Sequence, residues 1–320
     1  GIFMYRPIAK FMKNIDQRTT VLADFGTENT YPYKNIINSC RRRKVPIMAY
    51  LHGSSIYINK NVIVGKDTIL PEKLNLLLQR VLFGKECNVF YDKYLVSINQ
   101  KETYFKSSSW RWFDNHSRVK EIGIPRYTKE WVNRFTLSNG KLEANNKSKN
   151  KKLKVVLFLS GNIHNTAAYQ EKLSELIKSL SKMNGINFKI KQHPRAEVLQ
   201  LIGINSVKTC ISNFSSSELI EWADIGVLYS STVAYEMLIR GTCIVVPKYI
   251  DHNTTVFEKN KVCVEIDSLP SLVNFIENYS NNSILPYEKN IEKFIHEYIY
   301  GKKEYSEMMD EFYKSIFYNY

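Results

Sequence analysis

Two short polar segments in the second half of the chain carry residue types that suit an anionic ligand. The first is His193, Pro194 and Arg195, which follow an alternating, strand-like segment. An arginine guanidinium can match phosphate oxygens with two parallel donors, and a histidine can hydrogen-bond a phosphate or a base. Pro194 restricts His193 to an extended conformation, which aims its imidazole. We interpret the triplet as a ligand contact, with a histidine that only caps its own strand end as the alternative.

The second segment is Ser230, Ser231 and Thr232, which lies between an apolar strand-like run and a helical pattern. Hydroxyls and backbone N–H groups at a helix N-terminus form a ready anion site. Ordinary N-capping, for which serine and threonine are common, is the alternative. Glu236 follows on the same predicted helix. Its carboxylate could accept hydrogen bonds from ribose hydroxyls, although most glutamates are simply exposed.

The first half offers candidates for the reacting groups. His52 and Gly53 follow a strand-like run, where the glycine lets the backbone approach a ligand closely and the imidazole could serve an acceptor or a leaving group. Asp24 and Glu28 follow an earlier run. Either carboxylate could deprotonate an acceptor hydroxyl or act as a nucleophile. A turn with an incidental histidine is an equally good interpretation of His52.

Two further positions give weaker signals. Gly161 follows the first strand-like run of the second half, where a tight turn could approach donor phosphates. Arg126 follows Pro125 after the last strand-like run of the first half. It could face a ligand, but a surface arginine after a proline needs no function.

The histidines and cysteines predict no metal site. His116, His164, His252 and His296 form no ligand pattern with nearby acidic residues, and no pair of aspartates stands at a strand end. The 5 cysteines are widely spaced and contain no CxxC pair. We therefore expect a protein that needs neither metal nor cofactor and resides in the reducing cytoplasm.

The elements that must position these residues alternate between strands and helices. Such alternation is typical of βα units and of a mainly parallel sheet, so the predicted fold class is α/β. In open sheets of this kind, ligands bind beyond the carboxyl ends of the strands, which is where both polar segments fall. The predicted strands are 21–24, 47–51, 94–97, 154–160, 188–191, 225–229 and 243–247, and the predicted helices are 33–43, 71–83, 166–183, 215–222 and 232–240.

A polar, Asn- and Lys-rich stretch at 139–152 has no apolar periodicity and is typical of a flexible linker. It divides the chain into an N-terminal α/β domain at 1–138 and a second α/β domain at 153–285. Residues 286–320 form aromatic-rich helices that could pack back across the first domain. The first residue is glycine rather than methionine, so we expect the N-terminal domain to be trimmed.

Composition narrows the functional classes. Hydrophobic residues make up 44% and charged residues 24%, as in folded globular proteins, and no apolar run is long enough to cross a bilayer. The net charge of +14 favours an anionic partner. The 21 tyrosines are dispersed rather than interleaved with arginines on one face, which argues against nucleic acid as that partner.

Taken together, His193 with its neighbours, Ser230 to Thr232, Glu236 and the following Gly241 resemble the donor-binding domain of bacterial surface-polysaccharide transferases. Similar motifs occur in capsule Kdo transferases, in bacterial sialyl- and polysialyltransferases and in teichoic-acid glycerophosphotransferases. The resemblance covers about residues 153–250. It departs from the sialyltransferases in the first half, where Asp24 with Phe25 and Gly26 matches their acidic-acidic-glycine motif imperfectly.

The resemblance implies a GT-B-like fold, with two Rossmann-like domains, a cleft between them and C-terminal helices packing back on the first. It also implies that the domain at 1–138 lies on the acceptor side and that the domain at 153–285 binds the donor nucleotide. It implies that His193 and Pro194 meet a nucleotide and that Ser230, Ser231 and Thr232 meet its phosphate. The implied function is a glycosyltransferase that moves a sugar from a nucleotide-activated donor, CMP-linked such as Kdo or sialic acid, to a bacterial surface glycan in capsule or lipopolysaccharide biosynthesis.

Three alternatives stay open. Two are a teichoic-acid-type CDP-glycerol phosphotransferase and a GT-B-like UDP-sugar enzyme, and the non-enzymatic one is a basic nucleic-acid-binding protein. For the transferase, the expected partners are the nucleotide-sugar donor and an anionic or lipid-linked glycan acceptor, without nucleic acid. The expected location is the cytoplasm, with peripheral contact at the inner face of the cytoplasmic membrane.

Overall fold

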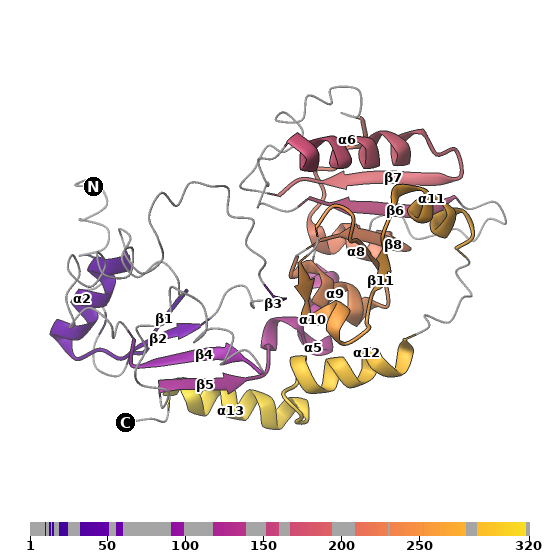
Figure 1. Ribbon diagram of the computed structural model, residues 1–320. Helices are drawn as coiled ribbons and strands as arrows, with labels where there is room; N and C mark the ends of the chain where they lie inside the picture. Colours follow the sequence, from indigo (N-terminus) through magenta and orange to yellow (C-terminus); the bar gives the residue numbers. More distant parts are fainter. Residues whose placement is uncertain are drawn as a thin grey trace. The chain divides into compact units, whose positions relative to one another are not determined.

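The chain forms two compact units in the computed structural model (Figure 1). Unit 1 comprises Gly1–Ser55, Leu70–Pro125 and His296–Tyr320, and unit 2 comprises Ile56–Ile69 and Arg126–Ile295. The structure describes residues 10, 13, 15, 19–24, 33–50, 56–59, 91–98, 118–138, 152–159, 167–193, 209–229, 231–251, 253–279 and 287–317.

Unit 1 contains a parallel four-stranded sheet. Its order is β1 (Val21–Asp24), β2 (Ile47–Tyr50), β4 (Lys93–Ser97) and β5 (Val119–Ile122). Helix α2 (Tyr33–Arg43) joins the first two strands and buries Ile37 and Cys40 in the core beneath them. A parallel pair needs such a crossover connection, so this segment forms the βα unit that its apolar spacing predicts.

The C-terminal helices complete unit 1. The chain passes from α12 (Glu288–Phe294) in unit 2 through a π-helical turn (Ile295–Ile299) to α13 (Tyr305–Phe317), which packs on β5 (Figure 1). Ile316 of α13 is buried in one cluster with sheet residues Met48, Leu95 and Ile122. The Ile124 N–H donates to the Ile299 carbonyl at 2.7 Å. The prediction that the C-terminal helices pack back on the first domain is therefore confirmed for 296–317.

Unit 2 contains a parallel five-stranded sheet. Its order is β11 (Val264–Ile266), β9 (Cys243–Pro247), β8 (Ile225–Leu228), β6 (Leu153–Phe158) and β7 (Ile186–Lys191). From β6 the chain first adds β7 on one side and then returns to add β8 on the other. The order of strands therefore reverses at β6. Such a switch point leaves a crevice at the carboxyl ends of the two strands that diverge from it.

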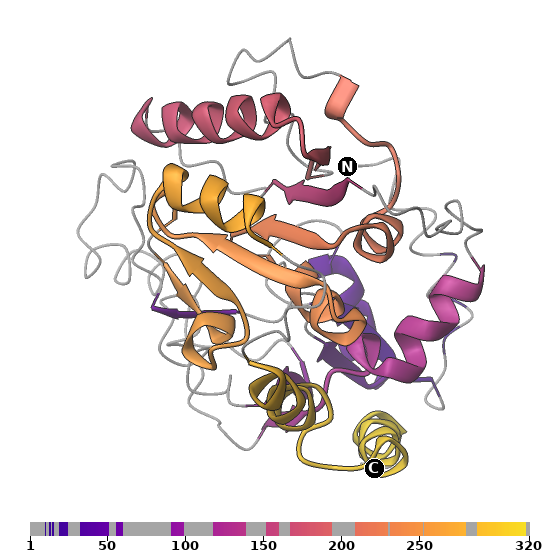
Figure 2. The same ribbon diagram turned by 90° about the vertical axis from the view of Figure 1, so that its right-hand side faces the viewer.

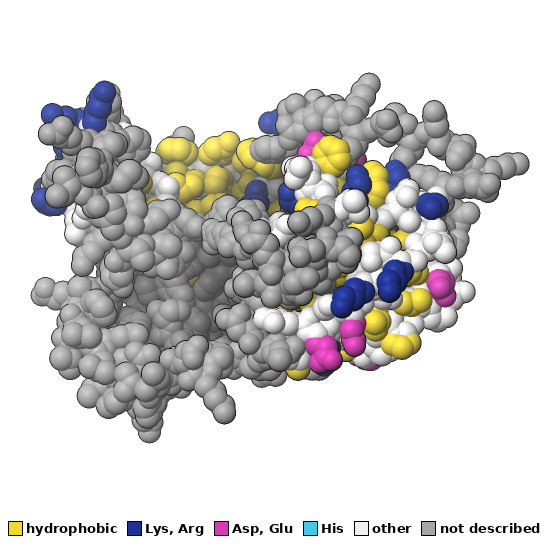
Figure 3. Space-filling model, turned by 90° about the horizontal axis from the view of Figure 1, so that it is seen from above, with side chains coloured by type: hydrophobic (Ala, Val, Ile, Leu, Met, Phe, Trp, Pro, Cys, Tyr) yellow, Lys and Arg dark blue, Asp and Glu magenta, His cyan; other side chains and the backbone are white. Residues whose placement is uncertain are grey.

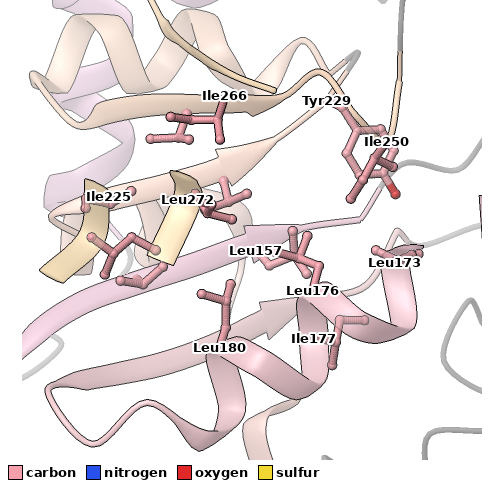
Figure 4. Close-up of a cluster of buried hydrophobic side chains, with 14 of the residues drawn as sticks. Leu157, Leu173, Leu176, Ile177, Leu180, Ile225, Tyr229, Ile250, Ile266 and Leu272 are labelled. Carbon is pink, nitrogen blue, oxygen red and sulfur yellow. The ribbon is translucent and has the colours of Figure 1, made fainter. Parts of the chain in front are cut away.

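One face of this sheet is covered by α6 (Ala167–Lys182) and α11 (Leu269–Glu277). The leucines of α6 recur every three to four residues, so they form one apolar stripe. Leu173, Leu176 and Leu180 are all fully buried and pack on strand residues such as Leu157 and Ile225 (Figure 4). This stripe is the one that the sequence predicts.

The opposite face carries α8 (Ser216–Trp222) and α9 (Val233–Arg240); α6 and α9 lie on opposite sides of the sheet in Figures 1 and 2. A Cβ at Gly226 of β8 would lie 1.9 Å from Cε of Met237 on α9. The absence of a side chain at Gly226 thus lets α9 approach the strand closely. The helix ends at Gly241, whose φ of 70° is the left-handed conformation that glycine adopts readily.

Several elements of unit 2 were not predicted. They are the 3-10 turn η4 (Pro125–Tyr127), α5 (Lys129–Ser138), α10 (Val256–Lys259), β11, α11, and the two-stranded antiparallel ladder of β3 (Tyr57–Asn59) with β10 (Thr254–Thr255). The predicted strands and helices otherwise agree with the structure to within one or two residues at most ends. The predicted helix at 71–83 lies outside the described residues, as does the predicted linker except for Lys152.

Candidate functional site

The candidate site lies at the carboxyl edge of the unit 2 sheet, where the strand order reverses. Tyr229 follows β8 and leads into Ser231, Thr232 and α9. Its hydroxyl lies 2.5 Å from the hydroxyl of Tyr169 in the first turn of α6, and both rings are buried. This hydrogen bond fixes the end of β8 against α6. The short loop that begins α9 therefore starts from a rigid point.

The start of α9 differs from an ordinarily capped helix. Thr232 is the N-cap residue, yet its backbone is helical and its side chain makes no capping hydrogen bond. The Ser231 hydroxyl accepts from the Val233 N–H at a long 3.4 Å. The Thr232 hydroxyl instead hydrogen-bonds the hydroxyl of Tyr127 in η4. The first turn thus presents a positive dipole end whose N–H groups are weakly satisfied by its own side chains, which suits an anion.

Tyr127 is held from several sides. It is 5% exposed, and its ring stacks on that of Tyr235 from α9 with centroids 5.0 Å apart. The guanidinium carbon of Arg126 lies 4.7 Å from the centre of the same ring. Burial raises the pKa of Tyr127, against smaller opposing effects of the Arg126 charge and the Thr232 hydrogen bond. The phenol is therefore protonated at neutral pH.

Glu236 lies one turn into α9 and joins it to α8. Its carboxylate accepts from the Ser217 hydroxyl at 3.0 Å and pairs with the Arg240 guanidinium at 3.3 Å. The side chains of Glu236 and Arg240 are only 16% and 13% exposed. Arg240 also donates to the Val132 carbonyl of α5 at 3.4 Å. These contacts make Glu236 part of a network between helices, and its predicted contact with ribose stays a prediction.

His193 lies two residues beyond β7 at the same edge of the sheet and is half-buried. The pairing of β6 with β7 extends to Leu159, whose N–H donates to the Lys191 carbonyl at 2.9 Å. The Lys191 ammonium donates to the Phe214 carbonyl at 2.5 Å, just before α8. The end of β7, two residues before His193, is thus hydrogen-bonded both to Leu159 and to Phe214. A nucleotide contact of this histidine stays a prediction.

The remaining predicted site residues are less well defined. Asp24 is the last residue of β1 in unit 1, and the structure describes its backbone only. The others lie outside the described residues: Glu28, His52, Gly161, Pro194, Arg195 and Ser230. Their roles as base, nucleophile or donor contacts stay predictions.

Metal binding and cysteine chemistry find no support in the described part of the chain. Within the ranges that the structure describes, no three His, Cys, Asp or Glu residues are grouped as a metal site requires. Burial raises the pKa of Cys40 to about 11 and that of Cys243 to about 12, so these thiols are poor nucleophiles. Over the same described ranges, no helix has the length and apolar character needed to span a membrane.

The sequence did not indicate Tyr127 or Ser217 as site residues. Tyr127 precedes Thr232 by more than a hundred positions and belongs to no motif. The only available signal was Arg126, next to it, which the sequence offered as a weak candidate. In the sequence, Ser217 is one of several consecutive serines that could cap a helix. Only the packing of α8 on α9 brings it to Glu236.

The two parallel α/β units, the switch point and the returning C-terminal helices define the GT-B class of fold. Among solved structures, the chain is similar to the wall teichoic acid polymerase TagF, with a TM-score of 0.53, 13% identity, and 95% of this chain and 90% of that one covered. It is also similar to α,α-trehalose 6-phosphate synthase from Burkholderia multivorans, with a TM-score of 0.52, 11% identity, and 97% and 75% covered. The predicted fold class is confirmed.

No family model matches the sequence, and no curated protein matches it either. At identities of 11–14%, the solved structures establish the fold and leave the activity to be argued from the site.

Proposed function

We propose that the protein is a glycosyltransferase that takes its donor from a nucleotide-activated sugar bound at the carboxyl edge of the unit 2 sheet. The observation that carries the proposal is the start of α9, which lies at the switch point with Thr232 turned to Tyr127 instead of capping the helix. A helix N-terminus of this kind stabilises a phosphate in the bound donor and in the departing nucleotide alike.

The proposed reaction transfers the sugar to an acceptor hydroxyl. The bond between the anomeric carbon and the donor phosphate oxygen breaks, its electron pair leaves with the nucleotide, and the acceptor oxygen bonds to the anomeric carbon. The acceptor proton passes to a base, for which we propose Asp24, Glu28 or His52 of unit 1. Ser231 and Thr232 would hold the phosphate, and a protonated His193 would support it as it leaves.

The proposed donor is CMP-linked, such as Kdo or sialic acid, and the proposed acceptor is an anionic or lipid-linked bacterial surface glycan. The net charge of +14 supports an anionic acceptor and peripheral contact with an anionic membrane. A CDP-glycerol phosphotransferase is the second candidate. It is favoured by the likeness to TagF, one structure of which carries CDPG in its name, at a TM-score of 0.53 and 14% identity.

Nucleotide-dependent thermal stabilisation tests the proposal. The full chain would be heated with CMP, CDP, UDP or GDP and with the corresponding sugar nucleotides. A ligand present at 100 times its dissociation constant should stabilise the protein by roughly 2.7 kcal/mol. Stabilisation by cytidine nucleotides supports the proposed donor class, and a preference for UDP would replace it. Transfer from CMP-sialic acid, CMP-Kdo or CDP-glycerol, measured as nucleotide release with a glycan acceptor, then separates the two candidates.

His193→Ala is the matching test of the predicted nucleotide contact. If His193 contacts the donor, the variant should lose the cytidine-nucleotide shift while unfolding at the temperature of the unliganded wild type. His296→Ala is the control, because His296 lies in the π-helical turn of unit 1. If nucleotides raise the unfolding temperature of His193→Ala as much as that of the wild type, His193 does not contact the donor, and the rest of the proposal stands.

A nucleic-acid-binding protein is the non-enzymatic alternative. On the right-hand side of Figure 3, the described Lys and Arg side chains lie among acidic and apolar ones and form no continuous basic track there. Binding to random DNA with a steep salt dependence, and no shift with any nucleotide, would favour that alternative.

A further inference from the structure

The edge of the unit 1 sheet at which its parallel strands begin carries a cluster of cations. Arg41, Arg42 and Arg43 form the last turn of α2, and Lys44 follows in the turn that leads to β2. All four residues are exposed. At the left of Figure 3, where Figure 1 draws α2, the described charged side chains are all Lys or Arg. We call this edge, together with the end of α2, the amino edge of unit 1.

The neighbouring strands add to this positive charge. Lys93 is the first residue of β4, and Arg118 immediately precedes β5. The burial of Lys93 and the like charge of Lys120 both lower the pKa of Lys93, so cations are crowded here. Among the described residues within one position of the four strand starts, Asp92 is the only carboxylate. Its Oδ2 accepts from the Ile47 N–H at 2.8 Å.

The end of α2 is completed by its own backbone. The Lys44 N–H donates to the Arg41 carbonyl at 3.1 Å and the Val45 N–H to the Cys40 carbonyl at 2.9 Å, which is the Schellman arrangement. Val45 and Cys40 pack in one buried cluster, the apolar contact that commonly accompanies this motif. Lys44 has a φ of 56°, in the left-handed region. A lysine therefore stands where the backbone alone favours glycine.

Helix α13 brings exposed aromatic side chains to the same edge. Its first turn places Met308 against the backbone just beyond the carboxyl end of β5. It ends at the amino end of β1, where the Thr20 hydroxyl donates to the Ile316 carbonyl at 3.3 Å (Figure 1). Phe317, next to Ile316, is 56% exposed, and Tyr313, one turn earlier, is 49% exposed. The amino edge thus presents both cations and exposed rings.

This combination suits the surface of an anionic bilayer. Lysine and arginine are attracted by the negative surface potential of such a membrane, and aromatic rings lie at the boundary between headgroups and acyl chains. The cations and rings are distributed across the whole width of the sheet, from β1 to β5, so they form a surface. Single-stranded nucleic acid is instead bound along a basic groove with stacking rings in it. The arrangement therefore favours a planar partner.

We propose that the amino edge of unit 1 is a docking surface for an anionic lipid bilayer, with the end of α2 as its cationic part and with Tyr313 and Phe317 as its interfacial rings. The inference rests on the proposed function for the choice of a membrane as the partner, and it names the surface that meets this membrane.

Docking in this way constrains the acceptor. The carboxyl edge of the same sheet, which carries Asp24, lies at the other end of the strands. At about 3.3 Å per residue, strands of four or five residues hold that edge about 15 Å from the docking edge. A lipid-linked acceptor must therefore extend well beyond its headgroup to reach the carboxyl edge.

Vesicle binding by the full chain tests the docking surface. Vesicles of phosphatidylcholine, with or without phosphatidylglycerol, would be sedimented with the protein. The wild type should bind only the vesicles that contain phosphatidylglycerol, and less as salt is raised, because exposed charges are screened. Arg41→Gln should weaken this binding about fivefold, the share of one cation near an anionic surface. Arg134→Gln, which removes an exposed cation of α5 in unit 2, is the control and should change nothing.

Lys44→Gly separates membrane binding from a structural role. Glycine relieves the left-handed backbone, so the variant should unfold at a higher temperature and yet bind phosphatidylglycerol vesicles about fivefold more weakly. Lys261→Gly is the matched control. Lys261 is exposed, has a φ of 52° and follows α10 in the same Schellman arrangement. It should gain the same stability and keep full vesicle binding.

Phe317→Ser tests the aromatic part of the surface. It should weaken binding to phosphatidylglycerol vesicles several-fold and leave the unfolding temperature unchanged, because the ring is already mostly exposed. Phe214→Ser is the control, since Phe214 is a 40% exposed ring of unit 2. It should bind vesicles like the wild type.

The outcomes also separate this inference from the proposed function. Equal binding to both kinds of vesicle, or full binding by Arg41→Gln and Lys44→Gly, would overturn the docking surface. Binding to random RNA or DNA through the same residues, without vesicle binding, would overturn it in favour of nucleic acid. The nucleotide-dependent thermal shift is measured without vesicles. Its failure overturns the proposed function, whereas a failure of vesicle binding leaves the donor site standing.

Discussion

Helices α8 and α9 begin with the same kinds of residue and use them differently. Before α8, Ser215 accepts from the Glu218 N–H at 3.2 Å while the Glu218 carboxylate accepts from the Ser215 N–H at 2.7 Å. This is a reciprocal capping box, and α10 begins in the same way. At α9, Thr232 makes no cap and turns to Tyr127. A serine or threonine run before a helix is thus structural in one case and, we propose, ligand-directed in the other.

The difference shows which observation separates the two uses. Residue type cannot do so, because both helices begin with hydroxyl side chains. The two uses differ in the hydrogen-bond partner of the hydroxyl and in the strand that the helix follows. Helix α9 begins directly after β8, one of the two strands at the switch point, whereas α8 begins after the segment that follows β7, the outermost strand of the sheet.

The largest expected effect concerns Glu236, which joins the two helices. Glu236→Ala should lower the free energy of unfolding by about 2–4 kcal/mol, because Arg240 then keeps a poorly hydrated charge without its carboxylate. Denaturant unfolding measures the loss. Glu236→Gln, which keeps an acceptor for Ser217, should lose less, and Glu221→Ala on the exposed side of α8 should be neutral. A stable Glu236→Ala variant that no longer binds nucleotide would instead assign Glu236 to the ligand.

Removing each of the two hydroxyls in turn tests whether the starts of α8 and α9 have different roles. Thr232→Val should weaken CMP by about 1–2 kcal/mol. Any loss of stability should come from the Tyr127 contact alone, since no cap is lost. Ser215→Ala should lower the free energy of unfolding by about 1 kcal/mol and leave CMP binding unchanged, because a cap is lost. Thermal unfolding measures the stability of each variant, and calorimetry measures its affinity for CMP. If both variants lost only stability, α9 would be an ordinary helix start.

The smallest expected effect is a pH dependence confined to α8. Hydrogen bonds from Ser215 hold the pKa of the Glu218 carboxyl below its usual 4.5. A carboxyl with a lowered folded pKa contributes full stability above the unfolded value and loses it as pH falls through the folded one. Acidification below about pH 4.5 should therefore destabilise the wild type slightly more than Glu218→Gln. Unfolding temperatures from pH 3 to 7 measure the difference, about a few tenths of a kcal/mol for so exposed a group.

Much of unit 2 could be predicted because its signals are local. The apolar spacing of α6 and the glycine at 241 depend on neighbours within a few residues, and both agree with the structure. The capping box of α8 was also readable, since Ser215 and Glu218 stand at the required spacing. The ladder of β3 with β10 was not, because it pairs two very short segments about two hundred positions apart.

The candidate site also combines residues with local sequence signals and residues that only the packing of distant segments brings together. His193, Ser231 and Thr232 could be named as candidates because each follows a predicted strand, and strand ends of a parallel sheet gather at one edge. Tyr127 and Ser217 were missed because their contacts arise only when η4 and α8 pack on α9. A single sequence carries no signal for such contacts.

The path of the chain through unit 1 has a consequence for biosynthesis. The Ile299 carbonyl and Met308 close on Gly123, where an added Cβ would lie 2.6 Å from an atom of each. Strand β5 is therefore covered by residues that leave the ribosome long after it does. Unit 1 therefore cannot complete its packing on β5 until unit 2 has been synthesised. Until then, the side of its sheet that α13 covers stays exposed. Chaperone binding to nascent chains should accordingly persist on unit 1 until α13 appears and cease there, while unit 2 is released earlier.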